Sequence, residues 1–239
     1  AVAFDTETLN LNRKFNNGFL TWQFSYKEGH AVVLPIEHPD CPIFENPEAK
    51  FRLVEAAQRL FNNSAEKSRI RCFVAHNAKF DLSVLLGQFG IIQRNPDAPY
   101  FWCTQNAMHW LDENRKSLAR FMEAGAKPYS LKTLGKEFFN FRYRAQHLEL
   151  RADGKLSDLA IDDLAEYGGS DTILTLALYL HQLKLASEQP NDALPKLIDF
   201  QRFYYTKTNR SLALMECNGL YVSAKHISLL QGSDSPIWN

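Results

Sequence analysis

Short apolar runs typical of strands dominate the first third of the chain, and amphipathic helical patterns fill most of the remainder. Lys27, Glu28 and Gly29 separate two of the apolar runs and indicate a hairpin. Ser157 is the predicted N-cap of a long late helix. The predicted strands are 1–6, 19–26, 29–36 and 70–75, and the predicted helices are about 47–63, 78–89, 104–123, 130–139, 158–188 and 196–217. Early strands followed by many helices predict an α/β or α+β fold.

Four acidic side chains fall within these elements at spacings that bring them together. Asp5 and Glu7 are two apart in the strand-like segment AVAFDTET, so both project from one face. Asp81 follows Asn77 by four positions in HNAKFD, near the start of a predicted helix, and we expect the two to share a face. The segment YGGSD ends in the fourth acidic residue, Asp171.

The YGGSD segment lies inside the late helix, where four-residue spacing places Tyr167 and Asp171 on one face. Clustered carboxylates repel one another, and a divalent cation removes that cost. Hard oxygen ligands without Cys or His favour Mg²⁺ or Mn²⁺ over zinc. Two such ions are a common apparatus for phosphodiester hydrolysis. The alternative for the acidic residues of any one segment, taken alone, is that they are ordinary solvated surface charges.

Taken together, the segments FDTET, HNAKFD and YGGSD resemble the three motifs of the proofreading 3′–5′ exonuclease domain of family A, DNA polymerase I-like polymerases. This family belongs to the tyrosine-bearing branch of the DEDD exonucleases. FSYKEGHAVVLPIEHP resembles its paired strands and YSLKTLGKEFF its helix before the third motif, so the resemblance spans about residues 1–185. It implies an RNase H-like α/β fold with a mixed central sheet flanked by helices.

The chain is long enough for one main domain, and a proline-bounded break at Pro190 to Pro195 suggests an appendage after it. We expect an exonuclease domain at 1–188 and a C-terminal helical extension at 189–239. Within that extension, RSLALMECNGLYVSAKHISLL resembles the start of a family A polymerase thumb.

The resemblance also implies roles for the acidic residues. Asp5, Glu7, Asp81 and Asp171 correspond to the ligands of two divalent cations, Mg²⁺ or Mn²⁺. Tyr167 corresponds to the residue that orients the attacking water. Because a phenol with a pKa near 10 is a poor base at neutral pH, we expect Tyr167 to position this water and not to remove its proton. These five residues are the expected catalytic set.

Five further residues are expected at the substrate: Thr6, Leu11, His76, Asn77 and Phe80. Asn77 corresponds to a contact with the terminal nucleotide or its phosphate, and Leu11 to an apolar wedge between the last two bases. Leu11 could equally be an ordinary core leucine. His76 could simply pack and hydrogen-bond at the end of its strand.

The expected reaction is stepwise hydrolysis of DNA from a single-stranded or frayed 3′ end, releasing nucleoside 5′-monophosphates. The chain carries no motif resembling a polymerase palm, so we expect no polymerase activity in it, although a polymerase domain in the same parent chain is a possible partner. Two alternatives stay open: an exoribonuclease of the RNase D type, and a silent structural or DNA-binding module. One departure from the family is Trp102-Cys103-Thr104, where relatives often carry an Asp-Thr pair.

Composition narrows the class of protein further. Basic and acidic residues number 27 each, so affinity for nucleic acid must come from local features. The stretch from Arg115 to Lys155 is relatively basic and is either a track for phosphates or solvated surface. Four scattered cysteines without a C-x-x-C pair and the absence of a long apolar run predict a cytoplasmic protein that does not enter a membrane. We also expect a monomer.

Overall fold

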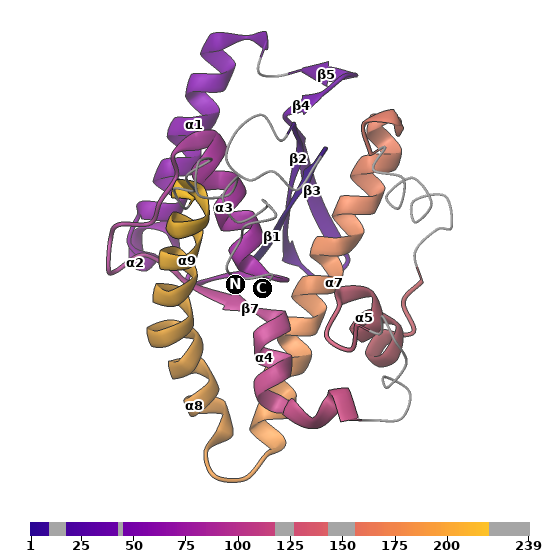
Figure 1. Ribbon diagram of the computed structural model, residues 1–239, viewed down its shortest axis with the longest axis vertical. Helices are drawn as coiled ribbons and strands as arrows, with labels where there is room; N and C mark the ends of the chain where they lie inside the picture. Colours follow the sequence, from indigo (N-terminus) through magenta and orange to yellow (C-terminus); the bar gives the residue numbers. More distant parts are fainter. Residues whose placement is uncertain (10–17, 43–44, 118–126, 143–155, 220–239) are drawn as a thin grey trace, which may run out of the picture.

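A five-stranded mixed sheet forms the centre of the molecule (Figure 1). The computed structural model describes residues 1–9, 18–42, 45–117, 127–142 and 156–219. The strands lie in the order β3-β2-β1-β6-β7, and β4 and β5 form a separate two-stranded ribbon. Their bounds are β1 (Val2–Thr8), β2 (Phe19–Lys27), β3 (His30–Pro35), β4 (Glu37–His38), β5 (Cys41–Pro42), β6 (Cys72–Ala75) and β7 (Tyr100–Cys103).

Strand direction decides where a site can form. β1, β2 and β3 are antiparallel neighbours, whereas β1, β6 and β7 run parallel. The carboxyl ends of β1, β6 and β7 therefore meet at one edge of the sheet, which is where open α/β sheets bind ligands. Lys27 pairs with His30 across the predicted hairpin, and Gly29 supplies the positive φ of 72° that the tight turn requires.

Helices account for most of the remaining described chain (Figure 1). Asn46 caps the first of them by accepting hydrogen bonds from the backbone of Glu48 and Ala49, with Pro47 at the first helical position. The helical elements are α1 (Pro47–Asn62), α2 (Ala65–Ser68), α3 (Ala78–Phe89), α4 (Thr104–Leu111), α5 (Leu131–Phe139), α7 (Ile161–Glu188), α8 (Ala193–Asp199), a π-helix (Phe200–Tyr205), α9 (Thr206–Asn218) and short 3₁₀ turns at Glu113–Ser117 and Leu156–Asp158.

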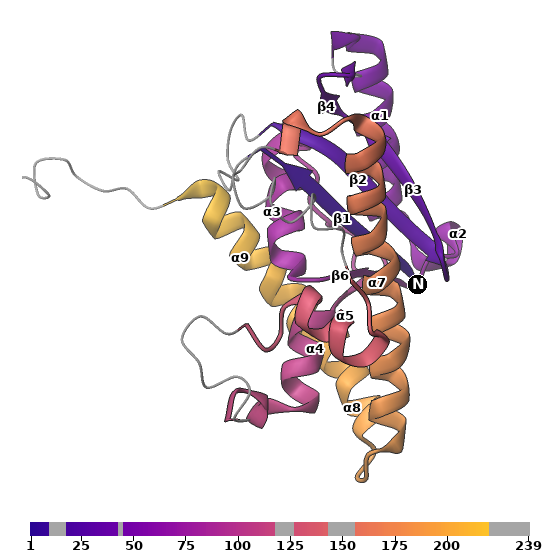
Figure 2. The same ribbon diagram turned by 90° about the vertical axis from the view of Figure 1, so that its right-hand side faces the viewer.

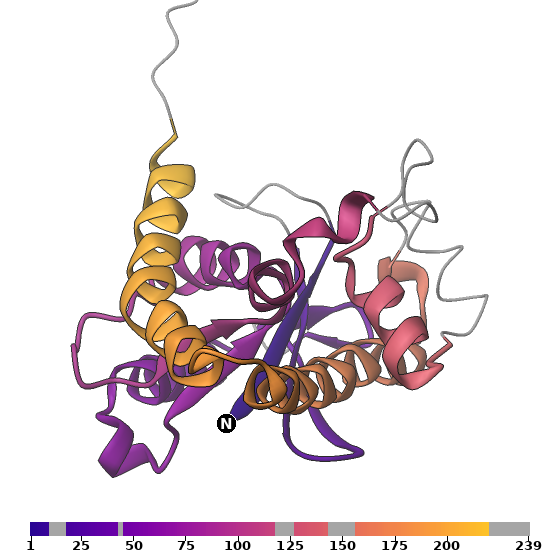
Figure 3. The same ribbon diagram turned by 90° about the horizontal axis from the view of Figure 1, so that it is seen from below.

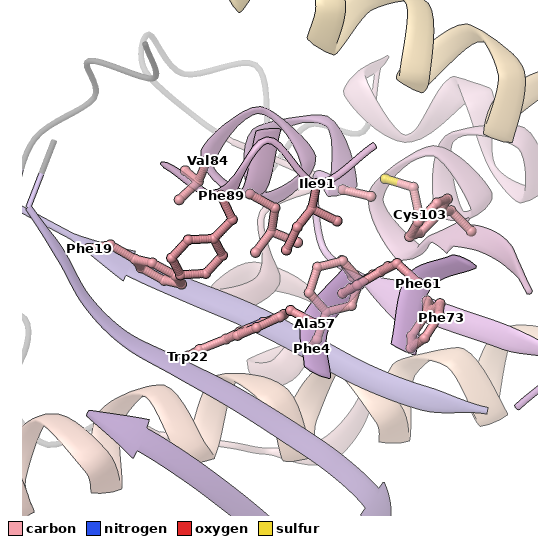
Figure 4. Packing of buried hydrophobic residues seen from close by; sticks show 14 of the residues in the cluster. Phe4, Phe19, Trp22, Ala57, Phe61, Phe73, Val84, Phe89, Ile91 and Cys103 are labelled. Carbon is pink, nitrogen blue, oxygen red and sulfur yellow. The ribbon is translucent and has the colours of Figure 1, made fainter. Parts of the chain in front are cut away.

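The two faces of the sheet bury different cores. One face packs on α1 and α3 through a cluster rich in aromatic rings, where Phe61 stacks on Phe73 with ring centroids 4.5 Å apart (Figure 4). The other face packs on α4, α7 and α8 through a cluster that combines small residues such as Ala3 and Val74 with the ring of Trp102. Figures 2 and 3 show α7 running along its own side of the strands, with α3 and α9 side by side on the opposite side.

The C-terminal helices are joined to the sheet by hydrogen bonds as well as by packing. β7 is an edge strand, and its outward backbone N–H groups need partners. The Phe101 N–H donates to Thr206 Oγ1 at 2.9 Å, and the Cys103 N–H donates to Gln201 Oε1 at 3.1 Å. The π-helix and the start of α9 therefore cover this edge.

Most predicted elements are present, and the differences are local. The four-residue strand β7 was not predicted. The helix predicted at 104–123 ends at Leu111, and residues 118–123 of that prediction lie outside the described residues. The single helix predicted at 196–217 is instead α8, the π-helix and α9. No helix in the described part of the chain is long and apolar enough to cross a membrane.

Candidate functional site

Three of the predicted carboxylates converge between β1 and α7. Asp5 and Glu7 project from the same face of β1, as their two-residue spacing predicts, and Asp171 reaches them from α7. One oxygen atom from each of the three lies within 4.8 Å of the others. Glu7 and Asp171 are each only 6% exposed, so their charges face one another with little water between them.

Asp81, the fourth predicted carboxylate, is not a member of this group and approaches β1 from α3. Its Oδ1 atom accepts hydrogen bonds from the Thr6 backbone N–H at 3.0 Å and from the Thr6 hydroxyl at 2.8 Å. β6 pairs with β1 only at Val2 and Ala3, so Thr6 lies beyond the end of that pairing. Asp81 thus completes the hydrogen bonding of β1 where the neighbouring strand has ended.

The surroundings of Asp81 disfavour its ionised form when no cation is present. Burial raises the pKa of this carboxyl to about 7, and the negative charge of Asp171 adds to the rise. The two hydrogen bonds from Thr6 oppose the shift without cancelling it. An adjacent cation would restore the charged carboxylate.

Tyr167 lies four residues before Asp171 on α7, and both side chains are buried, as their spacing predicts. The ring is completely buried and packs in a small apolar cluster with Leu20, Leu156, Leu159 and Leu164. Its role in orienting water stays a prediction.

Gln23 is a buried polar residue at this site that the sequence reasoning missed. It pairs with Asp5 across β1 and β2. With the amide oriented so that both its atoms are hydrogen-bonded, Gln23 donates to the Asp5 backbone oxygen at 2.6 Å and accepts from the Thr21 hydroxyl at 2.8 Å. Gly168 of α7 lies directly above this amide, where a Cβ atom would come within 2.0 Å of it. The only signal in the sequence was a glutamine at an inward position of a strand.

The residues expected at the substrate occupy varied positions. Asn77 does not share a helical face with Asp81, because α3 begins at Ala78 and Asn77 precedes it in a left-handed conformation with φ of 63°. His76 Nδ1 is hydrogen-bonded to the Thr104 hydroxyl at 2.9 Å, the contact expected of a packing role. Phe80 is half-buried against the aromatic core. Leu11 lies outside the described residues.

The start of α7 is held by the ribbon of β4 and β5 and not by Ser157. The helix begins at Ile161, and its N-cap, Ala160, offers no side-chain acceptor. Asp40 Oδ2 instead accepts from the Ile161 N–H at 3.1 Å, and His38 Nε2 is hydrogen-bonded to the Leu159 oxygen at 3.0 Å. A cap distant in sequence replaces the predicted local one.

Arg115 is not available as a phosphate contact in the predicted basic stretch. Its side chain is buried, donates to the Pro128 oxygen and forms an ion pair with Glu137. Lys127, Lys136 and Arg142 are exposed, whereas Arg120, Arg144, Arg151 and Lys155 lie outside the described residues.

The chemistry of the donors fits a divalent cation. The converging atoms are all carboxylate oxygens, which Mg²⁺ and Mn²⁺ prefer. Three carboxylates at this separation repel one another strongly in a partly desolvated site. A bound cation is the simplest way to keep all three ionised near neutral pH.

Comparisons with solved structures find the same fold. A structure titled as the apo form of a nuclease is 22% identical, with a TM-score of 0.53 over 94% of this chain and 89% of that one. NrnC of Brucella melitensis with bound Mg²⁺ is 21% identical, with a TM-score of 0.52 over 93% and 89%. Escherichia coli RNase D, titled an exoribonuclease involved in structured RNA processing, is 14% identical, with a TM-score of 0.52 over 90% of this chain and 45% of that one.

Sequence comparisons narrow the assignment. A search of curated proteins yields no match. A family model described as 3′–5′ exonuclease matches residues 1–186, which contain all three acidic segments. Its match covers well over half of the chain, and the chain therefore belongs to the 3′–5′ exonuclease family.

Proposed function

We propose that this protein is a divalent-cation-dependent 3′–5′ exodeoxyribonuclease that removes nucleoside 5′-monophosphates from single-stranded or frayed 3′ ends. The observation that carries the proposal is the convergence of Asp5, Glu7 and Asp171, whose oxygens lie within 4.8 Å of one another. Membership of the 3′–5′ exonuclease family supports the direction of hydrolysis.

In this proposal the carboxylates of β1 and α7 would hold the metal ions. Asp5, Glu7 and Asp171 form the metal centre, and Asp81 supports it from α3 while fixing β1 through Thr6. When bound, two Mg²⁺ or Mn²⁺ ions supply Lewis acidity and neutralise charge that develops on the phosphate. Tyr167 positions the attacking water through its hydroxyl and does not remove a proton.

The substrate side is assigned to the end of β1 and the turn before α3. Thr6, Leu11, His76, Asn77 and Phe80 contact the terminal nucleotides in this proposal. The contact given to Leu11 is of the stacking type and does not depend on the identity of the base, so we expect hydrolysis that tolerates any sequence. A paired end must first separate, at a cost of a few kcal/mol that is smaller at a mismatch.

DNA is proposed over RNA because the three motifs resemble those of the exonuclease domain of family A DNA polymerases, and the stretch from Arg210 onward resembles the start of a polymerase thumb. The likeness in fold to RNase D is the observation that favours an exoribonuclease as the second candidate. Both activities need the same carboxylates, so the substrate preference requires an experiment.

The test compares a 5′-labelled single-stranded DNA with an RNA of the same sequence, each incubated with Mg²⁺, with Mn²⁺ or with EDTA. We expect a DNA ladder that shortens from the 3′ end, requires metal, and forms faster than the RNA ladder. Equal or faster loss of RNA would transfer the assignment to the exoribonuclease. Absence of cleavage with either metal would favour a silent module and overturn the proposal.

A further inference from the structure

A second site lies at the same edge of the sheet as the carboxylates. A surface pocket of about 350 Å³ opens between the start of α3, the first turn of α4 and the helices that follow Phe200. Asn77 follows the carboxyl end of β6, and Asn106 follows the carboxyl end of β7. Because β1 is parallel to both strands, the carboxyl ends of all three strands lie at one end of the sheet, with β6 about 5 Å and β7 about 10 Å from β1 by strand spacing.

The π-helix gives the pocket its aromatic wall. In a π-helix the hydrogen bonds run from residue i to i+5, so Tyr204 and Tyr205 both lie about one turn from Phe200. All three rings line the pocket, and the Phe200 and Tyr204 rings are nearly parallel, with an interplanar angle of 24°. Tyr204 is 68% exposed, which leaves a large aromatic surface uncovered beside a cavity.

Several uncharged polar residues also line this pocket. Three amides, from Asn77, Asn106 and Asn209, line the pocket together with the Thr208 hydroxyl. Asn209 is only 2% exposed, its amide lies beside the Tyr205 hydroxyl, and its Nδ2 atom makes no well-formed hydrogen bond among the described residues. An orphaned buried donor costs free energy unless a ligand or water satisfies it. The charge of Lys79, also in the lining, is balanced by an ion pair with Glu216.

An exposed aromatic ring beside several amides matches the chemistry of an unpaired nucleobase. The ring offers a stacking surface, and amides can donate or accept as the base edge requires. The lack of an uncompensated lysine in this lining makes a phosphate a poorer fit than a base.

We propose that this pocket holds an unpaired nucleobase of the substrate strand, upstream of the nucleotide that is being removed. The base stacks on Tyr204, and the buried amide of Asn209 donates to it. The inference rests on the proposed function and extends it, because it gives the enzyme a second hold on the single strand as each terminal nucleotide leaves.

The test measures binding of fluorescent octanucleotides by anisotropy in the presence of Ca²⁺. In each octanucleotide a different single position lacks its base. We expect one internal abasic position to weaken binding to the wild-type protein roughly tenfold, the size of one lost stacking contact. Tyr204→Ala should remove that penalty, whereas Tyr204→Phe, which keeps the ring, should retain it.

Phe203→Ala is the matched control, because Phe203 is the adjacent ring of the π-helix, is 48% exposed and does not line the pocket. This variant should keep the abasic profile of the wild type. Thermal unfolding of each variant confirms that it is folded.

The outcomes separate this inference from the proposed function. If the wild type digests oligonucleotides but Tyr204→Ala keeps the same abasic profile, the pocket does not bind a base and the nuclease assignment stands. If Phe203→Ala removes the abasic penalty to the same extent as Tyr204→Ala, Tyr204 has no specific role in binding the base. If the wild type neither cleaves nor binds any oligonucleotide, both proposals fail.

Discussion

At the scale of single residues, Asp81 combines a structural contact with an unfavourable charge. It satisfies the Thr6 backbone N–H at the open end of β1, yet burial raises its pKa to about 7. The folded, metal-free protein therefore binds a proton at Asp81 that the unfolded chain releases near pH 4. Stability from this group is fully present below pH 4 and is lost as the pH rises through 7.

The difference in unfolding free energy between the wild type and Asp81→Asn, measured by urea denaturation in EDTA, tests the raised pKa of Asp81. From pH 5 to pH 7 the wild type should lose about 1.4 kcal/mol per pH unit relative to the variant. His76, whose pKa burial lowers to about 4, changes stability in the opposite direction, but its effect cancels in the comparison. A difference that does not vary with pH would contradict the raised pKa.

At the scale of elements, the close contact of α7 with β2 sets the distance between Asp171 and the carboxylates of β1. Gly168 makes this approach possible, because any side chain there would displace the Gln23 amide that is hydrogen-bonded to the Asp5 backbone. Gly169, its neighbour, faces β3, where a Cβ atom would lie 3.4 Å from Ala31 in ordinary contact.

The two glycines therefore form a matched pair of substitutions. Gly168→Ala should destabilise the protein by about 1–3 kcal/mol through overpacking and reduce cleavage by up to roughly 100-fold through displacement of α7. Gly169→Ala should be neutral or stabilise by up to about 1 kcal/mol, because alanine favours a helix. Chemical denaturation and cleavage rates check both variants, and similar behaviour of the two would refute the role given to Gly168.

Elements with a strong local signal were predictable from the sequence, and those set by distant partners were not. The two-residue spacing of Asp5 and Glu7 and the four-residue spacing of Tyr167 and Asp171 place each pair as expected. Asn77 differs because its left-handed backbone places it before the first residue of α3, so it does not continue the helical face that carries Asp81.

The remaining differences have tertiary causes. Asp40 outcompetes Ser157 as the cap of α7 through a contact across 121 residues. The π-helix keeps a helical pattern of apolar residues, so its wider turn leaves little trace in periodicity. Gln23 acquires its place beside Asp5 only when β2 pairs with β1.

At the scale of the whole molecule, the C-terminal helices pack closely on the sheet and α3. They bury Leu197 and Tyr205, bind the edge of β7 through Gln201 and Thr206, and carry the π-helix pocket. The predicted boundary at 188 coincides with the end of α7. The position of this helix end does not test independent folding of the two predicted domains, which requires separate fragments.

Removal of everything after Glu188 should prevent cooperative folding, because it exposes the edge of β7 and deletes buried side chains that each contribute about 2–5 kcal/mol. A fragment that ends after Asn218 keeps α8, the π-helix and α9, and should unfold cooperatively. Thermal unfolding followed by circular dichroism compares the two. A shorter fragment that unfolds cooperatively and cleaves DNA would show that 1–188 is an independent domain.

The most direct test of the metal centre is cleavage of a 5′-labelled single-stranded DNA by Asp5→Ala combined with Glu7→Ala, with Mg²⁺ and with Mn²⁺. Glu48→Ala combined with Glu55→Ala is the control, because it removes the same charge from two exposed, ion-paired positions on α1. We predict that the control cleaves like the wild type, whereas the first variant stays folded and produces no ladder with either metal. Metal-dependent cleavage retained by the Asp5→Ala and Glu7→Ala variant would contradict the assignment of the site.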